Sequence, residues 1–69
     1  MNGRTYAIYV RTNRRVRWQY AEYCGRWSSV EEAVEEAKAQ MNGEPFEYRI
    51  QNIGTDEVFT GFVNWKGKE

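Results

Sequence analysis

The stretch from Ser28 to Asn42 constrains the fold most, because it is the one part of the chain with a clear helical period. Its apolar residues recur at the spacing of one helical face: Val30, Ala33, Val34, Ala37 and Met41. The segments on both sides alternate between apolar and polar residues, as strands do. One amphipathic helix between strand-like segments predicts an α+β domain.

Signals at both ends set the bounds of this helix. Ser29 followed by Glu32 is a capping-box pattern, in which the serine side chain accepts from a backbone N–H of the first turn. Gly43 predicts a left-handed stop after Asn42, and Pro45 prevents the helix from resuming. We therefore expect a well-defined helix that begins after Ser29 and ends near Asn42.

The segment from Arg4 to Cys24 predicts an antiparallel hairpin that turns around Asn13, a residue that tolerates a positive φ. The favoured register sets three pairs of apolar residues opposite one another: Val10 and Val16, Ile8 and Trp18, and Tyr6 and Tyr20. A slip by one residue would move every core side chain to the wrong face, so this register is preferred.

The reverse face of this hairpin is basic and aromatic. It carries Tyr9, Arg11, Arg15, Arg17 and Gln19, with Arg14 at the tip of the turn. Arginine beside an aromatic ring is chemistry that holds phosphates and stacks on a base or another side chain. The same residues also suit a plain solvated face, since arginine is a long and soluble strand residue. Both interpretations stay open.

Residues 46–53 and 57–65 predict a second antiparallel pair, joined by a two-residue type II′ turn at residues 54–55. Its register again sets three pairs opposite one another: Ile50 and Phe59, Tyr48 and Gly61, and Phe46 and Val63. In this register Tyr48 can lie across the gap that Gly61 leaves.

The elements together predict a ββαββ domain, a four-stranded antiparallel sheet with the helix packed on one face. The strand order is not determined. The core expected under the helix consists of Tyr6, Ile8, Val10, Trp18, Ile50, Phe59 and Val63. The open sheet face would show the arginines and Tyr9 beside the outward apolar residues Val58 and Phe62, a composition typical of interface hot spots and of single-strand nucleic-acid platforms.

The helix also carries more acid than capping requires. Four glutamates stand within six positions: Glu31, Glu32, Glu35 and Glu36. They form like-charge pairs one turn apart, which destabilise a helix slightly. They suit either a solvated outer face or an acidic stripe that meets a basic surface of a partner or imitates a phosphate backbone. Metal binding is disfavoured, because carboxylates on one helix do not form a cage without a second element.

The chain has 69 residues, which suits a single domain over residues 1–69. With one cysteine and no histidine, it can form neither an internal disulfide nor a zinc cage, and we expect no cofactor. The lone cysteine suits a reducing compartment, and no apolar run approaches the ~20 residues of a membrane span. Residues 1–4 lead into a strand rather than a signal peptide, so the sequence predicts a cytoplasmic protein without a membrane partner.

The lack of histidine also leaves no ordinary general base near neutral pH, and the serines and the cysteine have no base to activate them. No Gly-rich phosphate loop is present. We therefore expect no enzyme. The charge is uneven instead: residues 1–26 carry a net charge of +5 and residues 27–69 carry −5, which bears on partners rather than on fold.

A Trp-Ser-Ser-x-Glu-Glu-Ala helix start at residues 27–33 precedes Tyr48-Arg49-Ile50 and a Gly-Thr-Asp-Glu turn at residues 54–57. This arrangement resembles the layout of many small phage proteins. In size, in its single α+β domain and in its lack of catalytic groups, the chain is similar to anti-CRISPR and other anti-defence inhibitors. The resemblance implies a stoichiometric blocker that docks on a bacterial host complex and prevents nucleic-acid binding or assembly.

Three functions follow from these features. The first is a protein-binding inhibitor in the host cytoplasm, anchored by the acidic helix or by the arginine and aromatic face. The second is a nucleic-acid-binding module that uses the arginine hairpin. The third is a self-assembling module that uses a free strand edge or the Val58 and Phe62 patch, and homodimerisation stays open.

Overall fold

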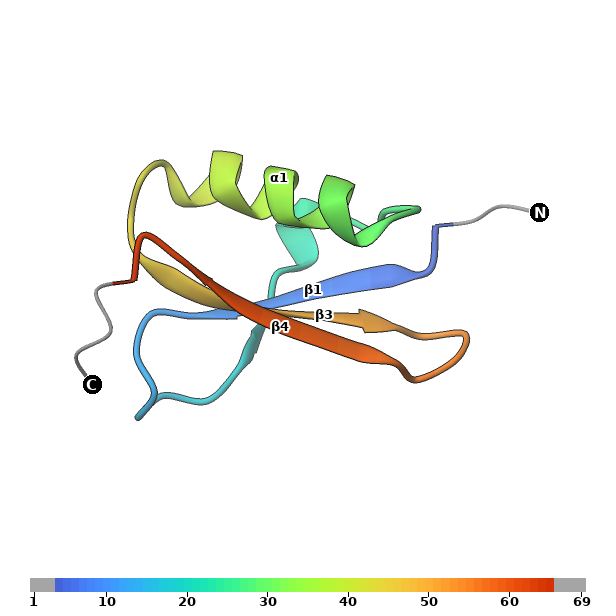
Figure 1. The fold of residues 1–69 in the computed structure, drawn as a ribbon, viewed down its shortest axis with the longest axis horizontal. Coiled ribbons are helices and arrows are strands. Elements are labelled where there is room, and N and C mark those ends of the chain that lie inside the picture. The colour runs from blue at the N-terminus through green and yellow to red at the C-terminus, as the bar shows by residue number, and fades with distance from the viewer. Residues whose placement is uncertain (1–3, 66–69) are drawn as a thin grey trace.

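The computed structural model describes residues 4–65. Their elements follow in the order β1 (Tyr6–Arg11), β2 (Gln19–Tyr20), the 3₁₀ helix η1 (Glu22–Cys24), α1 (Val30–Met41), β3 (Phe46–Asn52) and β4 (Val58–Val63). These residues form a four-stranded antiparallel sheet in the order β2-β1-β3-β4, and α1 lies across one face of it (Figure 1). The predicted α+β fold is confirmed.

The strand order that the sequence left open places β1 and β3 at the centre. All six residues of β1 pair with β3. Because β1 lies between β2 and β3, the chain must cross over β1 on its way from β2 to β3, and α1 is part of this crossover. The helix consequently packs on the two central strands.

The helix follows its sequence signals. Ser29 is the N-cap, and its side chain accepts a hydrogen bond of 3.2 Å from the N–H of Glu32. The Glu32 carboxylate does not complete the capping box; it accepts from the Ser28 hydroxyl at 2.8 Å. Asn42 ends the helix in the left-handed conformation with φ 53°. Two alanines, Ala33 and Ala37, are fully buried on the inner face, which lets the helix lie close to the sheet.

The core excludes some of the residues that the sequence predicted for it. Its buried members are Ile8, Val10, Ala21, Cys24, Ala33, Ala37, Phe46 and Ile50. Two expected members, Trp18 and Phe59, lie outside it. Phe59 is on the edge strand β4, beyond the strands that α1 covers, and remains 38% exposed while its ring meets the edge of Tyr6. A 12-residue helix covers only the two central strands, so apolar residues on β4 are buried incompletely.

The second hairpin has the predicted register. Phe46 pairs with Val63 and Ile50 with Phe59, and Tyr48 lies opposite Gly61. The Tyr48 ring and hydroxyl occupy the space that a Cβ at position 61 would need. A glycine is therefore required there, as the sequence indicated.

The turn of this hairpin is not the predicted type II′ turn. Residues 53–56 form a longer connection, closed by a 2.8 Å bond from the Asn52 N–H to the Glu57 carbonyl. The Asn52 side chain accepts from the Gly54 N–H at 2.9 Å, and the residue with positive φ is Asp56, at 69°, not Gly54. The asparagine side chain organises the turn, so Gly54 does not need a special conformation.

The first hairpin differs more from the prediction. The strand β2 has only two residues, and it pairs Tyr20 with Tyr9 and Gln19 with Val10. The predicted pairing of Tyr20 with Tyr6 is wrong by three positions, and so are the other two predicted pairs of that register. Since this shift is odd, the side chains of β2 change faces: Ala21 enters the core, while Tyr20 lies on the side away from α1.

Beyond β2 the chain returns to the same edge of β1. Trp27 forms a two-bond bridge with Tyr6, each backbone N–H donating to the other residue's carbonyl at 3.0 Å. The Trp27 indole N–H donates to the Cys24 carbonyl at 2.7 Å, which closes the short loop around η1. The outer edge of β1 is therefore covered twice.

No helix within residues 4–65 has the length and apolar character that crossing a membrane requires.

Candidate binding surfaces

The sheet face opposite α1 carries the first candidate surface, which we call the open face. Alternation along the strands points the following side chains to it: Ala7, Tyr9, Arg11, Tyr20, Glu47, Arg49, Gln51, Val58, Thr60 and Phe62. Trp18 joins them through its contact with Arg11. Tyr9, Arg11, Val58 and Phe62, four of the predicted partner-binding residues, lie on this face.

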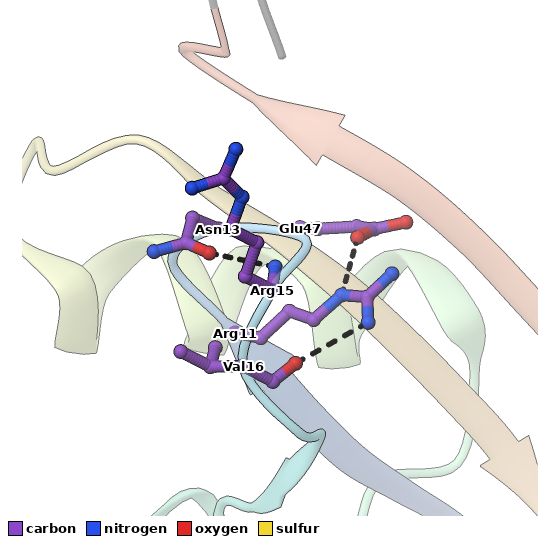
Figure 2. A network of polar contacts seen from close by, with 5 residues as sticks. All are labelled: Arg11, Asn13, Arg15, Val16 and Glu47. Atoms are coloured by element: carbon purple, nitrogen blue, oxygen red, sulfur yellow. Dashed lines mark hydrogen bonds and ion pairs between the residues drawn. The ribbon is translucent and has the colours of Figure 1, made fainter.

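Arg11 is tied down on the open face rather than free. Its Nε donates to the Glu47 carboxylate at 2.7 Å, and Glu47 is only 6% exposed (Figure 2). Its guanidinium also lies 4.3 Å from the centre of the Trp18 ring and contacts the Val16 carbonyl at 3.4 Å. The charge of Arg11 is satisfied within the protein, so this residue mainly holds the β1–β2 loop against β3.

Sequence reasoning did not identify Glu47 as the partner of Arg11. The two residues face each other in the pairing of β1 with β3, which are separated by more than thirty residues. A cross-strand ion pair is visible in a sequence only when the strand order is known. The order β2-β1-β3-β4 was the missing information.

Arg49, at the centre of the open face, has no acidic partner, in contrast to Arg11. It lies opposite Tyr9 in the sheet, with its guanidinium 5.8 Å from the Tyr9 ring centre. Tyr9 in turn contacts Tyr20, with ring centres 5.2 Å apart. Within the described part of the chain the Nε of Arg49 is buried without a hydrogen-bond acceptor, and no carboxylate forms a salt bridge with it. Buried donors of this kind need an explanation.

The β1–β2 loop brings further arginines to the same side. It turns at Asn13, whose side chain accepts from the Arg15 N–H at 2.7 Å, and it curls below the sheet, away from α1 (Figure 1). Arg14 reaches over Phe62 at 6.0 Å, and Phe62 contacts Trp65 at 4.9 Å. The Arg15 guanidinium points away from the Arg11–Glu47 pair (Figure 2).

The free positive charge of the first hairpin is therefore in its loop. Arg14, Arg15 and Arg17 are all exposed, and none of them forms a salt bridge with an acid among residues 4–65. Sequence reasoning placed Arg15 and Arg17 on a strand face together with Arg11. They lie in the loop instead, because pairing with β1 does not resume before Gln19.

The second candidate surface is the outer side of α1, on the other side of the molecule. It contains a hollow of about 330 Å³, which is lined by Trp27 and the four helical glutamates Glu31, Glu32, Glu35 and Glu36. Lys38 meets Glu35 at 3.3 Å, and the Gln40 amide donates to Glu36 at 2.9 Å. Trp27 was missed as a member of this surface, although its position just before the cap of the helix was a usable signal.

The two surfaces do not merge. The arginine loop lies on the far side of the sheet from α1, so its three unpaired arginines are separated from the four helical glutamates (Figure 1). The predicted candidates Glu31, Glu32, Glu35 and Glu36 thus belong to one surface, and the arginines belong to the other. A partner can use either surface without touching the other.

The thiol of Cys24 lies inside the core. Burial, together with the nearby charge of Glu36, raises the pKa of the Cys24 thiol to about 11. The thiol consequently stays protonated at neutral pH, where it is a poor nucleophile. Residues 4–65 contain no group of three or more cysteine, aspartate or glutamate side chains placed to hold a metal ion.

One surface presents arginine and aromatic rings, and the other presents carboxylates around an indole. Comparison of the chain with protein-family models, with curated proteins and with solved structures found no match.

Proposed function

We propose that this chain is a small non-enzymatic binding protein that docks on a protein partner through its open face. The centre of that face combines an arginine with aromatic rings on neighbouring strands. Arginine, tyrosine and tryptophan are the residues that carry most of the binding free energy in protein interfaces. Exposed Val58 and Phe62 on β4 add apolar area beside them.

The observation that carries the proposal is the unsatisfied state of Arg49. Its Nε has no acceptor within residues 4–65, and its guanidinium lies beside Tyr9 on a rigid central strand. An unsatisfied buried donor costs about 1–3 kcal/mol. The Nε itself is enclosed, but Arg49 as a whole is partly exposed, so a carboxylate brought by a partner can engage the terminal nitrogens of the guanidinium through two parallel hydrogen bonds.

The surroundings of Arg49 favour a protein over a uniform polyanion as its partner. Arg11, on the neighbouring strand of the same face, is already paired with Glu47 at 2.7 Å. Among the strand residues of the face, Arg49 is the arginine without an acid, and Tyr9, which contacts Tyr20, lies beside it; the unpaired Arg14 of the loop lies over Phe62 instead. A complementary surface would place one acidic side chain within an apolar patch, which is an ordinary composition for a protein interface.

In its most specific form, the proposal is a phage-type inhibitor that docks on a bacterial host defence complex and blocks nucleic-acid binding or assembly. The size and element layout of the chain support this form. The acidic side of α1 points away from the open face and would then remain outside the contact, or it would itself meet a basic groove of the target. Docking through the open face and docking through the acidic side of α1 are therefore tested with different variants.

The test is capture of partners from bacterial lysate by the immobilised protein. Arg49→Gln keeps most of the side-chain length and removes the charge, and we expect capture to fall by about tenfold or more. The matched control is Arg26→Gln, which changes an exposed arginine outside the open face. The reversal Glu31→Lys, Glu35→Lys and Glu36→Lys tests the helix side. If Arg49→Gln captures as much as the unchanged protein, the open face is not the docking surface.

A second candidate function is nucleic-acid binding, and the arginine loop favours it. Arg14, Arg15 and Arg17 are free of salt bridges in the described chain, and Arg14 lies over the Phe62 ring. Three phosphate contacts on a single strand predict a slope of about −2 for log K against log salt, so affinity falls about 20-fold between 50 and 200 mM. Fluorescence anisotropy with a single-stranded oligonucleotide measures this slope. A flat salt response, or capture from lysate that survives nuclease unchanged, contradicts this candidate.

A further inference from the structure

The edge strand β4 has backbone groups that no other strand uses. The Asn52 N–H donates to the Glu57 carbonyl, so Glu57 and every second residue after it turn their backbone groups toward β3. The N–H and C=O groups of the residues between them point outward: Val58, Thr60 and Phe62. In the strand order of residues 4–65, nothing pairs with this edge.

The two edges of the sheet are protected very differently. At one edge β2 has two residues, and the chain then covers β1 a second time through Trp27. At the other edge β4 runs over six residues, Val-Phe-Thr-Gly-Phe-Val, with no charged residue and no proline. Lysine, proline or a very short strand normally prevents an edge from pairing with another chain. None of these devices is present in β4.

Exposed apolar side chains accompany the free backbone groups. Val58 is 44% and Phe62 49% exposed on the open face, and Phe59 is 38% exposed on the face that carries α1. In a chain of 69 residues the core is small, and covering such side chains adds substantially to stability. The edge therefore offers both hydrogen bonds and apolar contact to a further strand.

We propose that β4 pairs with β4 of a second copy of this chain, in antiparallel orientation around a two-fold axis at Thr60. Thr60 then faces Thr60 of the second copy, and Val58 faces its Phe62. In this register all the outward backbone groups of Val58, Thr60 and Phe62 are satisfied in both copies. Both cross-strand pairs, threonine with threonine and an aliphatic with an aromatic residue, are favourable ones.

The ends of β4 fix this register. Asp56 and Asn64 have left-handed φ values of 69° and 55°, so extended pairing cannot continue beyond either end of the strand. Any other antiparallel register would leave outward groups of Val58 or Phe62 opposite these turns. The register centred on Thr60 is the one that uses the whole strand.

A second copy fits this edge better than an unrelated strand for two reasons. The strand is uncharged, so no like charges of the paired strands face one another, and a chain with a net charge of zero tends to associate. Pairing across a two-fold axis also closes the assembly, because the edges left outside are the two short β2 strands. The product is a dimer with one eight-stranded sheet and both open faces on the same side.

Sedimentation velocity over a range of concentrations tests the proposal with a pair of lysine variants. Thr60→Lys puts two ammonium groups opposite each other at the axis, and we expect it to raise the dissociation constant of the dimer about tenfold or more. Thr12→Lys adds the same charge at an exposed position in the β1–β2 loop and should leave the dimer intact. Circular dichroism checks that both variants keep the fold.

Cross-linking tests the register itself. Residues opposite one another in a hydrogen-bonded antiparallel pair have Cα atoms about 5.5 Å apart, within the range that a disulfide spans. Under mild oxidation Thr60→Cys should give a covalent dimer and Thr12→Cys should not, while the native Cys24 is buried and does not compete. The proposal is overturned if the unchanged protein stays monomeric at millimolar concentration, if Thr60→Lys dimerises as well as Thr12→Lys, or if the two cysteine variants cross-link equally.

Discussion

The two hairpins of this protein are built from similar alternating segments, yet only the hairpin of β3 and β4 has the register that its sequence predicts. In that hairpin a specific side-chain fit, Tyr48 over Gly61, supports one alignment of the strands. In the hairpin of β1 and β2 the strands share the Tyr9–Tyr20 ring contact, which needs no special residue opposite, and contacts from elsewhere decide the alignment. Apolar alternation selects a face, whereas a unique fit between two residues selects a register.

The contacts that decide the first hairpin come from outside it. Ala21 and Cys24 enter the core under α1, which draws the chain after Tyr20 toward the helix. Arg11 is held by Glu47 of β3 and covers Trp18, so the loop folds back on the open face rather than extending as a ribbon. The first hairpin therefore depends on tertiary structure, and the second depends mainly on itself.

The largest effect is expected from Gly61→Ala, which disrupts the fit that sets the register of the second hairpin. The new Cβ would overlap the Tyr48 ring and hydroxyl on the neighbouring strand. Overpacking of this kind costs about 1–3 kcal/mol, and we expect the free energy of unfolding in urea to fall by about that amount. In the double variant with Tyr48→Ala, the cost of adding the methyl group should nearly vanish. A loss that is equally large with and without the tyrosine ring would contradict the fit.

Removal of the ion pair should damage the first hairpin and spare the second. Glu47→Gln leaves the guanidinium of Arg11 without its charged partner at a largely buried site, at a cost of about 1–3 kcal/mol. Amide exchange should accelerate at residues 12–18 and remain slow in β4. The control is Glu44→Gln, at an exposed position before β3. Faster exchange throughout the sheet would show that the pair does not act locally.

The smallest effects concern the two asparagines that organise the turns. Asn52→Ala removes the acceptor for the Gly54 N–H in the second hairpin, and we expect a loss of about 1 kcal/mol in the free energy of unfolding. Asn13→Ala removes the equivalent bond to Arg15, in a loop that does not set the register. Its cost should be smaller, and the β1–β2 pairing seen by NMR should persist. Equal losses for both variants would remove the proposed distinction.

The sequence predicted most of the fold because its strongest signals are local. The helix has its cap at Ser29 and its left-handed end at Asn42, and the apolar face between them packs on the core as expected, with Ala33 and Ala37 fully buried. The strand order and the first register depend on contacts between distant segments, such as Arg11 with Glu47. These contacts cannot be read from periodicity alone.

The candidate surfaces were predictable to a smaller extent for the same reason. The outward position of Val58 and Phe62 followed from alternation along a strand with the correct register. The roles of Arg11 and Arg49 did not, because one has a carboxylate on the adjacent strand and the other has none. Identical side chains thus acquire different chemistry from their neighbours in the sheet.

The arginine loop and the acidic helix lie on opposite sides, so this protein of zero net charge presents two surfaces of opposite sign. Such a molecule rotates as it approaches a charged object and presents the side of opposite sign before contact. It would thus be retained on both cation- and anion-exchange resins at neutral pH and low salt. The orientation at encounter is set before any short-range recognition begins.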